Sequence, residues 1–334
     1  MGISGLLQAL RPITTNVDVR ELAGLRVAVD AYVWLHRSTY GCAADLCQGV
    51  RTRQYLNYLI GRLRLLLEAN VHVYLVFDGG PLPAKRGTEH ERRARREESK
   101  MRAMQCLREG NRGEAFQHFS RAVDVTPAMA MEWIRTVQGV DNVSFVVAPY
   151  EADAQLALLA KAGLVDAVIT EDSDILAFGC PRVLFKLDQD GRAQQILHAD
   201  LFHAPIEGLG DLRGWDEESF LRLCILSGCD YLPNVPGMGL RSAYRLLARY
   251  RQDPDRALRA LRLQQFGKGS SAAQVPPDYE VKFREAFLTF RHQRVFDPRT
   301  RQLVHLHPLP PDLAALPPAE LEVGQSAFGW WGRG

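Results

Sequence analysis

Four short hydrophobic runs in the first half of the sequence predict buried strands. They are rich in aliphatic residues and comprise residues 25–29, 71–77, 143–147 and 164–170. Such runs are typical of strands in a parallel sheet that is covered on both faces. Residues 55–68 and 152–161, which lie between the runs, have the apolar spacing and composition of helices. This alternation predicts an α/β fold with a central, mostly parallel sheet flanked by helices.

Every one of these runs leads into acidic residues. In an open α/β sheet the carboxyl ends of parallel strands share one edge, and ligands bind there. A single Asp after a strand is usually a turn residue or a helix cap, but four acidic strand ends in one chain are not explained by capping alone. The acids that follow the runs are Asp30, Asp78, Glu151, Asp153, Asp172 and Asp174.

These acids, together with Asp230 in a later turn, predict a divalent-metal site. Packing so many negative charges together is costly without cations. Oxygen ligands suit Mg²⁺, and zinc is disfavoured because no His or Cys accompanies the acids. Two divalent ions about 4 Å apart can drive hydrolysis of a phosphodiester bond. The set therefore predicts a hydrolase that uses two Mg²⁺, for which Mn²⁺ can substitute.

A strongly charged helical segment follows the second run. Residues 84–109 have a helical pattern, and residues 84–112 hold ten Lys or Arg against five Asp or Glu. The net charge of the whole chain is only +2, so the local distribution is the informative feature. Standing alone, the segment would be a solvated helix with i,i+4 ion pairs. Beside a carboxylate cluster it is a candidate clamp for a nucleic-acid strand, and we expect a helical arch over about residues 80–135.

The C-terminal third of the chain is predicted to be helical. Residues 217–227 and 240–250 form two helices joined by a linker rich in turn residues. Gly237 and Gly239 allow the backbone to approach a phosphate closely, and the next helix presents its free N–H groups there. Arg241 begins a row of arginines on one face of that helix, which favours DNA binding over a plain helix hairpin. Residues 267–277 are expected to form a flexible loop and residues 303–334 a proline-rich, irregular tail.

Several classes of protein are excluded by what the sequence lacks. No run approaches the roughly 18 apolar residues of a membrane span, and the N-terminus does not resemble a secretory signal. The six cysteines form no C-x-x-C pair and show no His/Cys spacing that is typical of zinc sites. Reduced thiols are therefore expected.

Six segments in series resemble the motifs of the flap endonuclease/XPG nuclease superfamily, whose core is PIN-like. They are residues 1–7, 27–30, 76–79, 148–155, 170–174 and 226–231. Within the superfamily, four further segments are similar to the exonuclease 1 branch. They are residues 32–36, 107–110, 177–180 and 295–298. The resemblance covers about residues 1–300.

The resemblance implies a role for each matching residue. Asp78, Asp174, Lys85 and Arg92 would be catalytic, and the seven acids would bind the metals. The DNA contacts it implies are Gly2 (after removal of Met1), Tyr32, His36, Arg93, Arg95, Arg96, Gly237, Gly239 and Arg241. For Tyr32 and His36 the residues alone favour ordinary packing. A potassium-assisted phosphate site would include Ser227, Asn234 and Met238.

The resemblance also implies a function. It is that of a 5′-to-3′ exonuclease on double-stranded DNA with 5′-flap endonuclease activity, acting as a nuclear monomer in DNA repair on ends, nicks and flaps. The resemblance further implies mismatch-repair proteins as partners. In the exonuclease 1 branch a long tail binds them, and this chain stops at Gly334, before that tail. The alternatives are a flap or Holliday-junction endonuclease and a non-catalytic scaffold that binds DNA ends.

We expect four regions: residues 1–110 as an N-terminal nuclease region that begins the arch, and residues 111–230 as an internal nuclease region. Residues 231–302 would form a helical DNA-binding region built around a helix-two-turn-helix, followed by the tail of residues 303–334.

Overall fold

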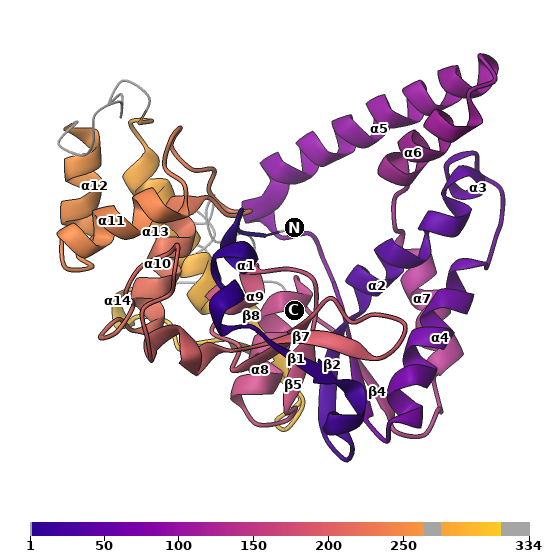
Figure 1. The fold of residues 1–334 in the computed structure, drawn as a ribbon, viewed down its shortest axis with the longest axis horizontal. Coiled ribbons are helices and arrows are strands. Elements are labelled where there is room, and N and C mark those ends of the chain that lie inside the picture. Colours follow the sequence, from indigo (N-terminus) through magenta and orange to yellow (C-terminus); the bar gives the residue numbers. More distant parts are fainter. Residues whose placement is uncertain (1, 264–274, 315–334) are drawn as a thin grey trace.

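The computed structural model describes residues 2–263 and 275–314, and its centre is a seven-stranded sheet (Figure 1). The strand order is β1-β7-β6-β5-β2-β3-β4. Neighbouring strands from β6 to β4 run parallel, and only β7 pairs antiparallel, with β6 and with β1. The mostly parallel sheet is thus confirmed. The strands are β1 (Thr15–Asp18), β2 (Arg26–Asp30), β3 (His72–Phe77), β4 (Val143–Val147), β5 (Ala167–Ile169), β6 (Arg182–Phe185) and β7 (Arg192–Leu197).

Helices cover both faces of the sheet, which explains why the three central residues of β2 are all apolar. Val27 and Val29 contribute to one core, whereas Ala28 contributes to the other. The first core is completed by α2, α4 and α7, in which Trp133 stacks on Trp34 with ring centroids 6.2 Å apart. The second is completed by α8 and α10. These helices are α2 (Ala31–Ser38), α4 (Tyr55–Glu68), α7 (Pro127–Val137), α8 (Ala152–Lys161) and α10 (Glu217–Ser227).

The predicted arch is a helical hairpin that projects away from the sheet (Figure 1). It consists of α5 (Arg86–Arg108) and α6 (Arg112–Ala122), which pack along each other. A small separate core joins them to α3 (Ala43–Cys47). Although α5 has 23 residues, it is densely charged. None of the helices in residues 2–263 and 275–314 is both long enough and apolar enough to cross a membrane.

Three helices follow in the C-terminal part of the chain: α11 (Leu240–Arg249), α12 (Pro254–Arg262) and α13 (Tyr279–His292). Helices α11 and α13 pack on α10, and α12 packs on α11. Four-residue helices complete the described fold: α1 (Leu6–Ala9), α9 (Asp174–Ala177) and α14 (Pro311–Ala314).

The prediction of an irregular tail from residue 303 is wrong for its described part. Gln302–His305 forms β9, which pairs antiparallel with β8 (Arg294–Asp297), and α14 follows. The β8–β9 hairpin was not predicted because β8 follows directly on the end of α13. Most of the predicted loop at 267–277 lies outside the described residues, as do residues 315–334. The four proposed regional boundaries remain predictions.

The turn after β3 brings it close to the end of β4. The Gly79 N–H donates to the Tyr150 carbonyl at 2.7 Å, and the Gly80 N–H donates to the Pro149 carbonyl at 3.0 Å. A Cβ on Gly79 would lie 1.9 Å from the Ala148 carbonyl oxygen, whereas one on Gly80 would lie 3.5 Å from its nearest neighbour. Only the first position therefore excludes a side chain.

We expect Gly79→Ala to lower the free energy of unfolding by about 2 kcal/mol or more, because the backbone at Ala148 would have to move. Gly80→Ala is the matched control and should change it by less than about 0.5 kcal/mol. Urea-induced unfolding of both variants beside the unsubstituted protein measures the difference. Equal stabilities for the two variants would contradict this account of the turn.

Candidate active site

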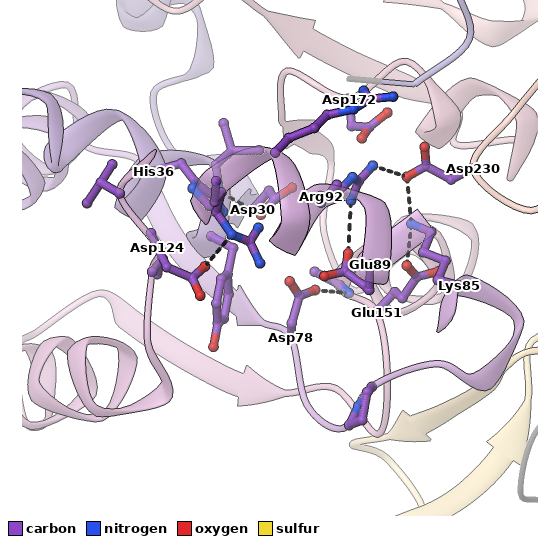
Figure 2. A pocket seen from close by; sticks show the side chains of 18 of the residues that line it. Asp30, His36, Asp78, Lys85, Glu89, Arg92, Asp124, Glu151, Asp172 and Asp230 are labelled. Atoms are coloured by element: carbon purple, nitrogen blue, oxygen red, sulfur yellow. Dashed lines mark hydrogen bonds and ion pairs between the residues drawn. The ribbon is translucent and has the colours of Figure 1, made fainter. Parts of the chain in front are cut away.

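The acids predicted from the strand ends meet at one edge of the sheet. Strands β5, β2, β3 and β4 are adjacent and parallel, so their carboxyl ends place the acids side by side. Asp174 is buried behind Asp172, whose Oδ1 accepts a hydrogen bond from the Asp174 N–H at 3.1 Å. The other six acids line a cleft of about 870 Å³, and Figure 2 shows five of them: Asp30, Asp78, Glu151, Asp172 and Asp230.

Local hydrogen bonds fix two of these carboxylates. Asp30 caps the N-terminus of α2, where its Oδ1 accepts from the Val33 N–H at 3.1 Å, and its Oδ2 accepts from the Thr170 hydroxyl at 3.1 Å. Asp78 Oδ1 accepts from the Ala152 N–H at 2.7 Å, at the start of α8. Helix N-termini stabilise negative charge. The strand–acid–helix sequence therefore holds each acid in a defined orientation.

Burial makes the cluster electrostatically strained. It raises the pKa of Asp30 to about 6 and, with the Asp30 charge beside it, the pKa of Asp78 to about 7. Burial, and then the nearby Asp172, raise the pKa values of Asp153 and Asp174 well above their ordinary value. These two acids also each have a buried Oδ1 that has no hydrogen-bond partner among the described residues. Oxygen ligands that lack partners in a cluster of carboxylates fit divalent cations such as Mg²⁺.

Two cations at the base of the arch compensate part of this charge. Lys85 forms ion pairs with Glu151 and, at 3.0 Å, with Asp230. Arg92 contacts the same Asp230 oxygen at 2.8 Å (Figure 2). Burial opposes ionisation of Asp230, but Lys85 and Arg92 outweigh it and lower the pKa of that carboxyl. Burial likewise opposes the charge on Lys85, yet Glu151 and Asp230 raise its pKa well above the ordinary value. The arch is thereby joined to the acids.

Two residues that were not predicted from the sequence orient Glu151. The Tyr231 hydroxyl donates to Glu151 Oε2, and the Gln293 amide lies 3.4 Å from that oxygen and 3.3 Å from the tyrosine hydroxyl. Tyr231 follows a predicted acid directly, so its position was a usable signal. Gln293 lies at the junction of α13 and β8, and nothing in its local sequence indicates this contact.

Gly2 lies against the acids, as the resemblance implies. A Cβ on Gly2 would lie 2.2 Å from Asp172 Oδ1 and 2.9 Å from Asp174 Oδ1, and its φ of +81° also favours glycine. A larger residue would have to displace the carboxylates. Met1 lies outside the described residues.

Most of the predicted DNA contacts on α2 and α5 lie around the same cleft. Tyr32, His36, Arg95 and Arg96 line it, and Arg96 forms an ion pair with Asp124 across it. Arg93 is exposed and does not contribute to its lining. Arg92, Arg95 and Arg96 on the same helix face the cleft, so Arg93 points elsewhere.

The predicted phosphate and potassium residues form a second group, in and beside the linker between α10 and α11. The Asn234 amide donates to the Met238 carbonyl at 2.9 Å, and the Ser227 hydroxyl donates to the Cys224 carbonyl at 2.8 Å. The Arg241 guanidinium donates to the Gly208 carbonyl, in the loop before α10. Neither these residues nor the linker glycines, Gly237 and Gly239, line the carboxylate cleft. The roles assigned to all these residues remain predictions.

Comparisons with known proteins place this geometry in a family. Residues 1–99 match the XPG N-terminal domain, and residues 142–230 match the XPG I-region. Exonuclease 1 of Arabidopsis thaliana is 42% identical over 306 residues, which are 92% of this chain and 40% of that protein. The DNA damage-inducible protein DIN7 of Saccharomyces cerevisiae is 36% identical over 93% of this chain and 70% of its own length. The chain thus spans less than half of the Arabidopsis relative.

A structural comparison supports the same fold. The catalytic core of Rad2 in complex with DNA substrate superposes with a TM-score of 0.64 over 97% of this chain and 95% of that one, at 21% sequence identity. At that identity the likeness concerns the fold alone. The matched sequence regions and the relatives show that the chain belongs to the XPG nuclease family, in the exonuclease 1 branch.

Proposed function

We propose that this chain is a Mg²⁺-dependent nuclease that removes nucleotides from 5′ ends of double-stranded DNA and also cleaves 5′ flaps. The observation that carries the proposal is the convergence of seven acids at one sheet edge beneath a basic helical arch. A protein that only bound DNA would gain nothing from carboxylates that repel phosphate. The exonuclease 1 name of the Arabidopsis relative supports an exonuclease activity.

The acids would hold two Mg²⁺. The unpartnered oxygens of Asp153 and Asp174 are available as ligands, and the carboxylates of Asp30, Asp78 and Asp172 line the cleft beside them. Bound Mg²⁺ would supply an activated water and positive charge for the phosphoryl oxygens. Glu151 is held by Tyr231 and Lys85, which fixes its orientation towards the cleft.

Lys85 and Arg92 have a separate task in this proposal. Both contact acids now, and both line the cleft that a DNA strand would enter. A phosphate close to them would gain charge-assisted hydrogen bonds, and these would place the scissile bond over the acids. Arg95 and Arg96 lie along the same side of α5 and would contact neighbouring phosphates. Tyr32, at the start of α2, offers an aromatic face for stacking on a base.

The linker between α10 and α11 would hold the uncleaved duplex. The N-terminus of α11 follows Gly239 and presents free N–H groups to a phosphate. We propose that K⁺ assists at Ser227, Asn234 and Met238, with Gly237 in the same turn. A nuclear location, action as a monomer in DNA repair and contact with mismatch-repair proteins belong to the same proposal.

Cleavage assays with Mg²⁺ test the function on three DNA substrates: a duplex with a recessed 5′ end, a 5′ flap and a four-way junction. We expect stepwise release of nucleotides from a recessed 5′ end and cutting at the base of a 5′ flap. Asp174→Asn should lower both rates by about a hundredfold or more, with DNA affinity largely unchanged. Asp141→Asn is the matched control and should cleave normally, because Asp141 precedes β4 and so lies at the opposite end of that strand from the acids.

Two outcomes of that assay would contradict the proposal. Preferred cutting of a four-way junction would indicate a junction endonuclease of the same family. DNA binding without cleavage of any substrate would indicate a scaffold.

Adjacent arginines on α5 provide a second test. Arg92→Ala should lower the single-turnover cleavage rate by about a hundredfold, because Arg92 lies at the acids. Arg93→Ala should leave that rate within about threefold, since Arg93 faces away from the cleft, and should at most weaken salt-dependent binding. Rates are measured with enzyme in excess over a flap substrate. Equal losses in the two variants would exclude a specific role for Arg92.

A further inference from the structure

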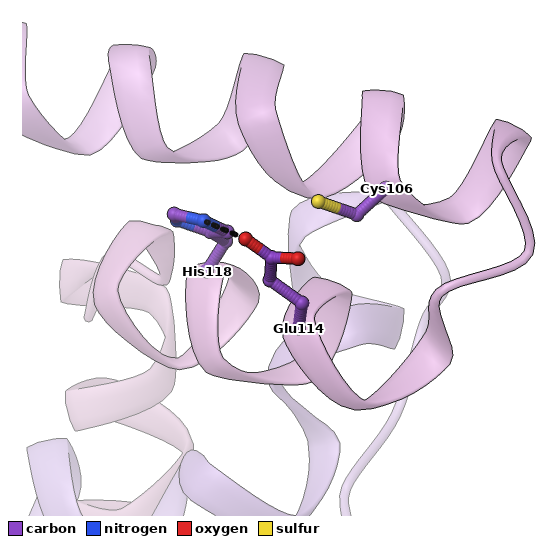
Figure 3. A group of neighbouring side chains, drawn as sticks. All are labelled: Cys106, Glu114 and His118. Carbon is purple, nitrogen blue, oxygen red and sulfur yellow. Dashed lines mark ion pairs between the residues drawn. The ribbon is translucent and has the colours of Figure 1, made fainter.

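Three metal-ligating side chains face one another inside the arch, away from the carboxylate cluster. Cys106 lies near the end of α5, and Glu114 and His118 lie one turn apart on α6 (Figure 3). One ligand atom from each lies within 4.8 Å of the other two. The Cys106 side chain is buried, with 8% of its surface exposed. The two helices thus bring together a thiol, a carboxylate and an imidazole that the sequence separates.

The contacts present within this group leave it incompletely satisfied. His118 Nε2 lies 3.9 Å from Glu114 Oε1, which is too long for a hydrogen bond. His118 Nδ1 is buried and has no hydrogen-bond partner in the part of the chain that the structure describes. A buried polar nitrogen without a partner is costly. Ordinary helix packing therefore does not account for an imidazole at this position.

We propose that Cys106, Glu114 and His118 bind a Zn²⁺ ion, with solvent as the fourth ligand, and that the ion cross-links α5 to α6. Sulfur, imidazole nitrogen and carboxylate oxygen are the ligand types of tetrahedral zinc sites. The carboxylate cluster offers oxygen ligands only, so the two sites differ in chemistry and should select different metals. An ion held by ligands from both helices would fix α5 relative to α6 at the end of the arch that lies far from its base.

Binding would release a proton from the thiol. Burial, and then the carboxylates of Glu114 and Glu109, raise the pKa of Cys106, so the free thiol is protonated. The cation replaces that proton as the sulfur becomes a thiolate ligand, and the proton passes to solvent. His118 also lines the large cleft, so the fourth position can be reached by solvent from beneath the arch.

Titration with Co²⁺ in excess Mg²⁺ tests the site, because Mg²⁺ occupies the oxygen ligands and Co²⁺ reports thiolate coordination by its absorption. The unsubstituted protein should show a thiolate-to-cobalt charge-transfer band that saturates at one equivalent and is abolished by Zn²⁺. Cys106→Ser and His118→Ala should lose it. Cys47→Ser and His90→Ala are matched controls and should retain it, since Cys47 lies on α3 and His90 is exposed near the arch base. Absence of the band, or its persistence in Cys106→Ser, would overturn the proposal.

Limited proteolysis separates loss of the metal from loss of the fold. Zn²⁺ should slow cleavage at the turn between α5 and α6 severalfold in the unsubstituted protein and have no effect in Cys106→Ser. Without Zn²⁺ the two proteins should be cut at similar rates, which shows that the variant is folded. Equal protection of both by Zn²⁺ would place the metal elsewhere and refute the site.

Discussion

The confinement of seven carboxylates to one edge of a sheet is the constraint on which the structure depends. Each loses hydration by burial and is repelled by its neighbours, so the fold must supply compensation. Hydrogen bonds from Thr170 and from the N-termini of α2 and α8 supply part of this compensation. The positive charges of Lys85 and Arg92 supply another part. The Oδ1 atoms of Asp153 and Asp174 receive no hydrogen bond from the described residues. Divalent cations would supply the positive charge that the protein itself does not provide.

The same constraint explains how distant parts of the chain are arranged. Four adjacent parallel strands are needed to deliver the acids, and close turns at Gly2 and Gly79 are needed to let them approach. The arch is tied to this edge because its basal cations pair with Asp230, which belongs to the linker after α10. Any change in the position of the arch would therefore alter the charge balance at the acids. Arch position and chemistry are coupled through Lys85 and Arg92.

The sequence predicted the parts of the fold that rest on local pattern. The bounds of α4, α8, α10 and β4 were predicted to the residue, and the acids meet where strand ends require. The sheet's β1, β6 and β7 were not predicted, since their sequences have less continuous apolar patterns and their positions depend on pairing across the chain. Gln293, the orientation of Arg93 and the meeting of Cys106 with His118 are set by packing between elements, which local spacing does not reveal. The assigned DNA contacts remain predictions.

Urea-induced unfolding of the unsubstituted protein and Asp153→Asn, in EDTA and in Mg²⁺, tests the central claim most directly. In EDTA the variant should be the more stable, because burial and Asp172 raise the pKa of Asp153. Folding of the unsubstituted protein must therefore either bury that charge in a repulsive cluster or add a proton to it, and the variant avoids both costs. Saturating Mg²⁺, at about a hundred times its dissociation constant, should stabilise the unsubstituted protein by about 2.7 kcal/mol for each ion bound. The variant should gain less, so that the order of stabilities reverses. The same order in both media would contradict the account, since Asp153 would then neither strain the metal-free protein nor hold a cation.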